Sequence, residues 1–447
     1  MTDHPDQTDL ADRAAQLVEA ALKAGADTAD AICVRGMSMS VDVRLGKVEE
    51  TRRAEGDDFT LRAFVGKRSA AVSANTLADP AELAERAVAM ARVAPQDPYN
   101  ALADPDRLTT TFPDLDLLDP SIPSAEELTD KARAAEDAAR AVPGVTNSGG
   151  GSAGWRLGGL VLATSHGFVG AYSASRFSIS ASAIAGEGTG MERDYDSESR
   201  IYRADLPDPV EIGRRAGDRA VRRLAPRQMA TGKGIVIYDP RISTGLIGHL
   251  VGAANGASIA RKTSFLIDKL GSAIFSPAIR VHDDPHRRRG LGSRPFDGEG
   301  VASAPLDIVS DGILRTWILD SASARELGLV TNGRANRGAS STSPGITNLT
   351  LEPGTQTPEE LIAEAGNGLY VTELIGHGAN LMTGDYSRGA AGFAIENGVL
   401  THPVAEVTIA GNLIDMFRNM KPANDLRYRF AVNAPTVAVE GLTIAGR

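Results

Sequence analysis

Hydrophobic and polar positions change their period along this chain of 447 residues, and the period predicts which elements it forms. An apolar helical face is present near the N-terminus, at Leu10, Ala14, Leu17, Val18 and Ala21. It predicts a helix over residues 9–23. Residues 39–53 and 59–73 alternate apolar and polar side chains around Gly-Lys turns, which predicts antiparallel hairpins. Asp79-Pro80 opens a second helix, because proline is favoured at the first helical position.

The middle of the chain alternates extended and helical segments. Residues 95–123 are rich in proline and aspartate and predict an extended connector, and Ser124–Glu127 is a capping box that starts a helix. Two paired strands are predicted at residues 155–162 and 168–183. The charged segment Glu192–Asp196 is predicted to be a loop.

A domain boundary is predicted near residues 225–232, where the composition is that of a loop. Residues 1–225 then form an N-terminal α+β domain in which helices cover a sheet, and residues 231–447 form a C-terminal β-rich domain. The second domain opens with a strand at 234–238, followed by an apolar helix predicted over residues 243–264.

This helix has an unusual composition. Gly245, Gly248, Gly252 and Gly256 recur three and four residues apart, although each glycine costs a helix about 1 kcal/mol relative to alanine. We expect these glycines to pack tightly against a neighbouring strand or subunit. His249 lies in the same apolar turn, and we expect it to be buried and to contribute to packing.

Several segments resemble the TldD/PmbA family. In the catalytic members of that family a His-Glu-x-x-x-His zinc motif stands where this chain has His249-Leu250-Val251-Gly252-Ala253-Ala254. Further matching segments are RKTSFLIDKLG at 261–271, GLGSRPFDGEGV at 290–301, DGILRTWILDSASARELGL at 311–329 and MTGDYSRGAAGFAIENG at 382–398. The resemblance covers nearly the whole chain, and the matching segments are most similar to the PmbA (TldE) branch. It implies an α+β N-terminal half and a curved, barrel-like mixed sheet in the C-terminal half.

The departures from the zinc motif indicate a chain without catalytic zinc. Leu250 replaces the glutamate and Ala254 replaces the second histidine, whereas a hydrolytic zinc site needs about three protein ligands and a general base. The family's zinc branch also takes a cysteine ligand from near its C-terminus, but the single cysteine of this chain is Cys33. The resemblance therefore implies that zinc is carried by a TldD-like partner subunit.

Charge and cysteine content restrict the class of partner and compartment. The formal net charge is −10 and the arginines are scattered, so no nucleic-acid footprint is visible. One cysteine cannot form an internal disulfide, which fits a reducing compartment. No run of about 20 apolar residues is present and the N-terminus lacks the features of a signal peptide, so we expect a cytoplasmic protein without a membrane span.

Two other polar clusters have ordinary structural interpretations. His282 and His286 flank Pro285, which argues against a shared helical face, so a solvated loop is expected there. Asp297 and Glu299 could act as an acid and base, but carboxylates two residues apart in a glycine-rich loop more often accept hydrogen bonds from backbone amides.

A loop rich in glycine, asparagine and serine carries Asn332, Arg334, Asn336 and Arg337. Beside an exposed strand, such a loop could bind an extended peptide by adding it as a further strand. It could equally be a mobile surface loop.

Three functional interpretations follow. The first is a PmbA/TldE-like subunit of a TldD/TldE-type metallopeptidase system, acting in proteolysis of peptides or unfolded chains as a heterodimer with the TldD-like chain, or as a homodimer. The β-rich half is the expected contact region. The second is a self-sufficient peptidase that holds a metal through His249 with His377 or His402. The third is a non-enzymatic scaffold or regulator of the gyrase-modulator type.

Overall fold

The computed structural model of the chain describes residues 8–75, 79–338 and 340–446. Its N-terminal part is built on a six-stranded antiparallel sheet with the strand order β3-β2-β1-β4-β5-β6. The strands are β1 (Thr28–Arg44), β2 (Lys47–Val65), β3 (Arg68–Asn75), β4 (Val145–Thr164), β5 (Val169–Ala185) and β6 (Glu192–Arg200). The helices beside them are α1 (Thr8–Lys23), α2 (Pro80–Val93), α3 (Ala125–Arg140) and α4 (Pro209–Arg222).

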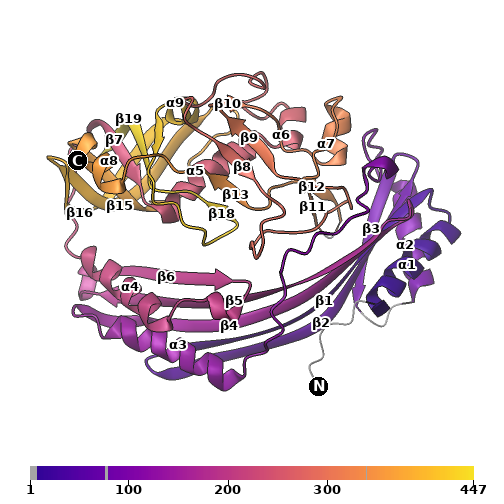
Figure 1. Cartoon of the computed structure of the whole chain (residues 1–447), viewed down its shortest axis with the longest axis horizontal. Coiled ribbons are helices and arrows are strands. Elements are labelled where there is room, and N and C mark those ends of the chain that lie inside the picture. Colours follow the sequence, from indigo (N-terminus) through magenta and orange to yellow (C-terminus); the bar gives the residue numbers. More distant parts are fainter. Residues whose placement is uncertain (1–7, 76–78, 339, 447) are drawn as a thin grey trace.

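One face of this sheet is covered by helices and the other by the C-terminal half. Along β1, Cys33 packs beneath α1 and α2, while Val41 packs beneath α3 and α4. Both residue numbers are odd, and side chains two apart in a strand share a face. Even-numbered Ile32 instead packs with Phe168 and Phe296. Figure 1 shows the result, a long curved sheet whose concave side faces the C-terminal half.

The C-terminal half contains a closed mixed barrel. Its strands are β7 (Gly232–Tyr238), β14 (Gly368–Ile375), β15 (Asp385–Glu396), β16 (Val399–Asn412) and β19 (Val437–Ala445). Parallel pairing of β7 with β14 joins antiparallel neighbours, and β16 pairs with β19 to close the ring. β17 (Met420–Pro422) adds to β19. The expected α+β fold with a barrel-like C-terminal sheet is therefore confirmed.

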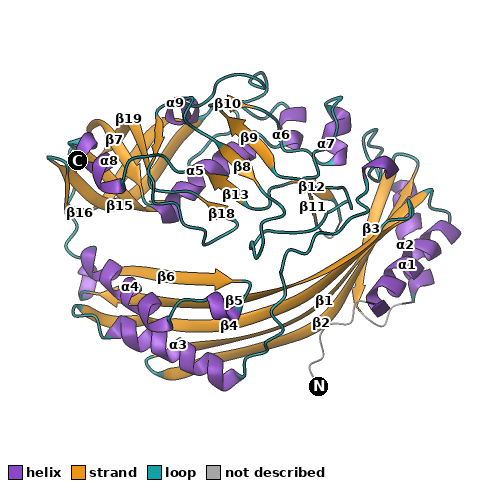
Figure 2. Cartoon of the chain, in the orientation of Figure 1, coloured by secondary structure: helices purple, strands orange, loops and turns teal. Residues whose placement is uncertain are grey.

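A smaller mixed sheet stands beside the barrel, in the order β10-β9-β8-β13-β18 (Figure 2). Its strands are β8 (Val281–Asp283), β9 (Leu306–Ser310), β10 (Ile313–Leu314), β13 (Leu349–Leu351) and β18 (Val432–Asn433). A separate hairpin consists of β11 (Ala335–Arg337) and β12 (Thr342–Pro344). The remaining helices are α5 (Pro240–Ala253), α6 (Gly256–Ala260), α7 (Ser321–Glu326), α8 (Pro358–Ala365) and α9 (Leu413–Arg418).

Three local predictions were wrong. The helix predicted over residues 243–264 is two helices, because the Asn255 side chain accepts hydrogen bonds from Ala257 and Ser258 and starts α6. The loop predicted at Glu192–Asp196 is the first part of strand β6. The solvated loop predicted around His282 begins with strand β8, which pairs with β13.

Within the described ranges, no helix combines the length and the apolar character that crossing a bilayer requires.

Candidate functional site

Helix α5 begins where barrel strand β7 ends. Asp239 accepts a hydrogen bond from the Arg241 backbone amide, and Pro240 occupies the first helical position. Proline lacks an N–H that would otherwise be unpaired there, so Asp-Pro starts the helix directly after the strand. The helix lies against the barrel core through Leu246, Ile247 and Leu250. This placement carries the zinc-motif positions into the C-terminal half.

The three zinc-motif positions differ in their surroundings. Leu250 and Ala254 are fully buried in the hydrophobic core, with 0% of each residue exposed. His249 is only partly buried, less than we expected, and its ring lies edge-on to Tyr386 with 5.8 Å between centroids. Burial, with a smaller contribution from Arg388, lowers the pKa of His249. One imidazole and two hydrocarbon side chains do not fit the donor set of a hydrolytic zinc ion.

The other candidate metal ligands that the sequence offered are Cys33, His377 and His402. Cys33 is buried in β1 beneath α1 and α2, where burial raises the pKa of its thiol to about 12. His377 is exposed, and His402 contacts the Thr401 hydroxyl at 3.2 Å. Residues 8–75, 79–338 and 340–446 contain no group of three or more His, Cys, Asp or Glu side chains suited to a metal ion.

The glycines of this region fall into two pairs. A Cβ atom placed on Gly252 would lie 2.7 Å from Leu381, and one on Gly256 would lie 2.6 Å from Leu319, so this pair packs closely as expected. At Gly245 and Gly248 a Cβ would meet no atom within 4 Å. The expected tight packing is therefore wrong for these two positions within the chain, and they leave one face of α5 open.

The predicted peptide-binding loop is largely bonded to its own chain. Asn332 binds backbone groups of Trp317 and Leu319. Arg334 is fully buried and its Nε lies 2.6 Å from a carboxylate oxygen of Asp283. Arg334 holds the loop against β8, and Asn332 holds it against the segment 317–319. Peptide binding at this loop stays a prediction.

The other two polar side chains of that loop point to different partners. Asn336 is exposed and accepts a hydrogen bond from Arg294 at 2.9 Å. Arg337 donates two hydrogen bonds to Asp30 in β1, at 2.7 and 2.6 Å. Arg337 therefore connects the C-terminal hairpin to the N-terminal sheet.

Asp297 and Glu299 bind backbone amides, as their spacing indicated. Asp297 accepts hydrogen bonds from the amides of Glu299, Val301 and Ala335, and Glu299 accepts one from Ser321. Burial, followed by the neighbouring Asp297 carboxylate, raises the pKa of Glu299 to about 7. This pair orders the loop between the sheets and is enclosed rather than presented to a substrate.

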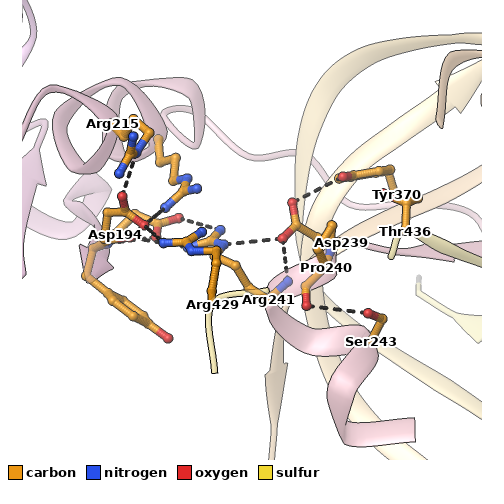
Figure 3. A network of polar contacts seen from close by, with 12 residues as sticks. Asp194, Arg215, Asp239, Pro240, Arg241, Ser243, Tyr370, Arg429 and Thr436 are labelled. Carbon is orange, nitrogen blue, oxygen red and sulfur yellow. Dashed lines mark hydrogen bonds and ion pairs between the residues drawn. The ribbon is translucent and has the colours of Figure 1, made fainter. Parts of the chain in front are cut away.

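A polar network that the sequence did not reveal joins the two halves (Figure 3). Asp194, Asp196 and Glu198 alternate along edge strand β6 and are buried. Asp196 accepts hydrogen bonds from Arg215 and Arg219 of α4, the shorter at 2.6 Å. The alternation of these acidic residues is present in the sequence. A loop was predicted there because charged side chains are unusual at the buried positions of a strand.

Two arginines of the C-terminal half complete this network. Arg241 of α5 donates to Asp194 at 2.7 Å, and Arg429 of the segment before β18 donates to Asp196 at 3.0 Å. Arg241 also contacts Asp239, which accepts a hydrogen bond from the Tyr370 hydroxyl at 3.1 Å (Figure 3). The carboxylates of β6 are thus paired from both halves of the molecule.

A pocket of about 260 Å³ opens beside the network. It is lined by residues of α4, α5, β14 and the segment 425–434, namely Arg219, Asp239, Arg241, Thr244, Tyr370, Asp425, Arg427, Arg429, Phe430 and Asn433, with Pro240, Val432 and Ala434. A second pocket of about 170 Å³ shares Arg219, Asp239, Arg241 and Tyr370 with the first. The junction between the halves is therefore a cleft rich in guanidinium groups.

Comparison with known protein families accounts for most of the chain. A family model described as the PmbA/TldA metallopeptidase C-terminal domain matches residues 231–446. Models of the central domain and of domain 1 of the same metallopeptidase match residues 118–224 and 29–91.

Curated relatives and solved structures agree with these models. Metalloprotease PmbA of Escherichia coli O157:H7 is 39% identical over 94% of this chain and 93% of its own length. A PmbA homolog of Haemophilus influenzae is 35% identical over 96% of this chain and 94% of its own length.

Two crystal structures share the fold over nearly their full length. A proposed modulator of DNA gyrase from Bacteroides thetaiotaomicron has a TM-score of 0.91 and 29% identity, and covers 99% of this chain and 100% of its own. TldE of Thermococcus kodakarensis has a TM-score of 0.83 and 20% identity, and covers 97% of this chain and 99% of its own. With matching models from residue 29 to residue 446, the chain belongs to the PmbA/TldD metallopeptidase family.

Proposed function

We propose that this chain is the TldE-like, zinc-free subunit of a two-subunit metallopeptidase system that degrades peptides or unfolded chains. The observation that carries the proposal is the burial of Leu250 and Ala254 in the core of the C-terminal half. A general base must reach the reacting water and a zinc ligand must offer a donor atom to the metal, whereas these two positions hold buried hydrocarbon side chains. Catalytic zinc then belongs to a TldD-like partner, which we propose to be cytoplasmic together with this chain.

Association with that partner is supported by an open edge in the N-terminal sheet. Strand β3 pairs only with Asp58–Val65 of β2. The rest of β2, Lys47–Asp57, pairs with β1 on one side, and its outer edge has no neighbouring strand among the described residues. Exposed strand edges are normally paired or hidden. We expected the β-rich half to be the contact region because of unpaired strand edges. The five barrel strands form a closed ring, so they do not supply such edges. We propose β2 as part of the subunit contact.

The test uses the full chain alone and co-expressed with a TldD-like chain. Elemental analysis of the isolated chain should find no stoichiometric zinc, and the pair should co-purify with zinc and peptidase activity. His249→Ala should leave zinc content, assembly and activity of the pair unchanged. One zinc per isolated chain, lost in His249→Ala, would establish the self-sufficient peptidase instead.

A regulator without a role in proteolysis remains the competing interpretation. It has one specific support, the likeness to the Bacteroides protein described as a proposed gyrase modulator. Light scattering separates the two interpretations. A chain that stays monomeric at micromolar concentration and shows no mass increase with the TldD-like partner contradicts the two-subunit proposal.

A further inference from the structure

The larger pocket at the junction of the halves has an unequal charge balance. Its walls hold Arg219, Arg241, Arg427 and Arg429 against two carboxylates, Asp239 and Asp425. Each carboxylate is already bonded within the chain, since Asp239 accepts from Tyr370 and Arg241, and Asp425 accepts from the amide and hydroxyl of Thr436. Arg219, Arg241 and Arg429 are likewise paired, with the buried carboxylates of β6. Among the described residues, Arg427 is therefore the lining guanidinium whose charge is left for a ligand.

Two of its arginines keep unused hydrogen-bonding capacity. In the part of the chain that the structure describes, the side chain of Arg427 has no hydrogen-bond or ion-pair partner. The Nε atom of Arg429 is buried and unpaired, although its NH2 group binds Asp196 and Glu198. An unpaired buried donor such as Arg429 Nε is costly, whereas the side chain of Arg427 is exposed and solvated. Guanidinium groups match the planar geometry of a carboxylate.

The pocket continues into the open face of α5. Arg241 and Thr244 line the pocket, and Gly245 and Gly248 follow them, each four residues further along the helix. Side chains at this spacing share a helical face. A Cβ at either glycine would meet no atom within 4 Å, so another backbone could approach the helix closely here.

We propose that this pocket binds the C-terminal carboxylate of a peptide, whose preceding residues lie along the Gly245 and Gly248 face of α5. Arg427 and Arg429 would donate to the carboxylate, and the Thr244 hydroxyl is placed to contact the last peptide unit. The choice of a peptide rests on the proposed function. The recognition of an oxyanion rests on the pocket itself, and inorganic phosphate would share that chemistry.

The test measures binding of a fluorescently labelled, short alanine-rich peptide to the full chain by fluorescence polarisation. Peptides with a free C-terminal carboxylate and with a C-terminal amide are compared, with inorganic phosphate as a competitor. The free carboxylate should bind at least about tenfold more tightly than the amide, which is the loss expected for charge-assisted hydrogen bonds. Equal binding of the two peptides, or the absence of binding by either peptide, overturns the proposal.

Two variants locate the site and one serves as the control. Arg427→Gln should weaken binding of the free-carboxylate peptide about tenfold and abolish the preference over the amide. Gly248→Leu should weaken both peptides while the melting temperature is maintained, because its side chain enters open space. Arg86→Gln removes the same charge from an exposed position on α2 and should bind as the wild type does. Wild-type binding by Arg427→Gln would exclude this pocket.

The two proposals fail separately. Assembly with the TldD-like chain is measured by co-purification, without peptide. If the pair assembles and degrades peptides while Arg427→Gln has no effect on peptide binding, the pocket assignment is wrong and the subunit proposal stands. If peptide binds as described but no TldD-like chain associates, the subunit proposal is wrong and the pocket assignment stands.

Discussion

Arg337 and Asp30 are 307 residues apart in the chain and form a two-point hydrogen-bonded ion pair, at 2.7 and 2.6 Å. The Asp30 carboxylate also pairs with Arg62 of β2, and all three side chains are nearly completely buried. Burial would raise the pKa of Asp30, but Arg62 and Arg337 outweigh burial and hold the pKa below its ordinary value. The pair is therefore a fixed joint between the C-terminal hairpin and the N-terminal sheet.

Arg337→Met should lower the free energy of unfolding by about 2 kcal/mol, because Asp30 loses two buried charge-assisted hydrogen bonds and keeps only its pair with Arg62. Urea denaturation at neutral pH measures the change. The control is Arg315→Gln, which breaks an exposed pair with Asp311 and should cost less than about 1 kcal/mol. Equal, small losses in both variants would show that the joint does not stabilise the fold.

Asp196→Asn should destabilise the chain by about 3 kcal/mol at neutral pH, because Arg215, Arg219 and Arg429 then lose their shared counterion. Burial opposes ionisation, but these arginines lower the pKa of Asp196. A lowered carboxyl pKa contributes stability above the unfolded pKa of about 3.9, and the contribution is lost as the pH falls below it. The gap between wild type and variant should therefore narrow below about pH 4. If the difference in unfolding free energy between the two proteins were independent of pH, the ionised state of Asp196 would not be the source of the stabilisation.

Glu299 should affect the pH dependence of the free energy of unfolding in the opposite direction to Asp196, and Glu299→Gln should remove that effect. The raised pKa of about 7 means that the folded chain binds a proton more tightly than the unfolded chain does. Stability should therefore fall as the pH rises from about 4.5 to 7, and the slope should disappear in the glutamine variant. Unfolding free energies at several pH values in this window test it. Parallel curves for the two proteins would show that Glu299 does not titrate there.

Two glycine-to-alanine changes should have opposite signs. Gly248→Ala should stabilise the chain by up to about 1 kcal/mol, because it adds helix propensity in open space. Gly213→Ala should destabilise it by about 2 kcal/mol or more, since its Cβ would lie 1.9 Å from the Ala135 carbonyl oxygen where α4 crosses α3. Melting temperatures of both variants measure the contrast. A stabilised Gly213→Ala protein would mean that the two helices separate easily.

The sequence by itself determined the elements whose signals are local. The capping box at Ser124 and Glu127 forms as predicted, and so does the apolar face of α1. The hydrocarbon side chains of Leu250 and Ala254, on which the prediction of a zinc-free chain rests, can also be read directly from the sequence. Helical and strand periods and capping chemistry involve residues a few positions apart, so one sequence is enough to recognise them.

The tertiary structure alone decided which distant residues meet. Asp194 and Asp196 have the alternation of a strand but charged side chains at its inward positions, and only the arginines of α4, α5 and the segment before β18 make that burial favourable. Gly245 and Gly256 look equivalent in the sequence, yet one faces open space and the other packs on Leu319. Such differences depend on what the fold brings opposite each residue, and local spacing carries no information about that.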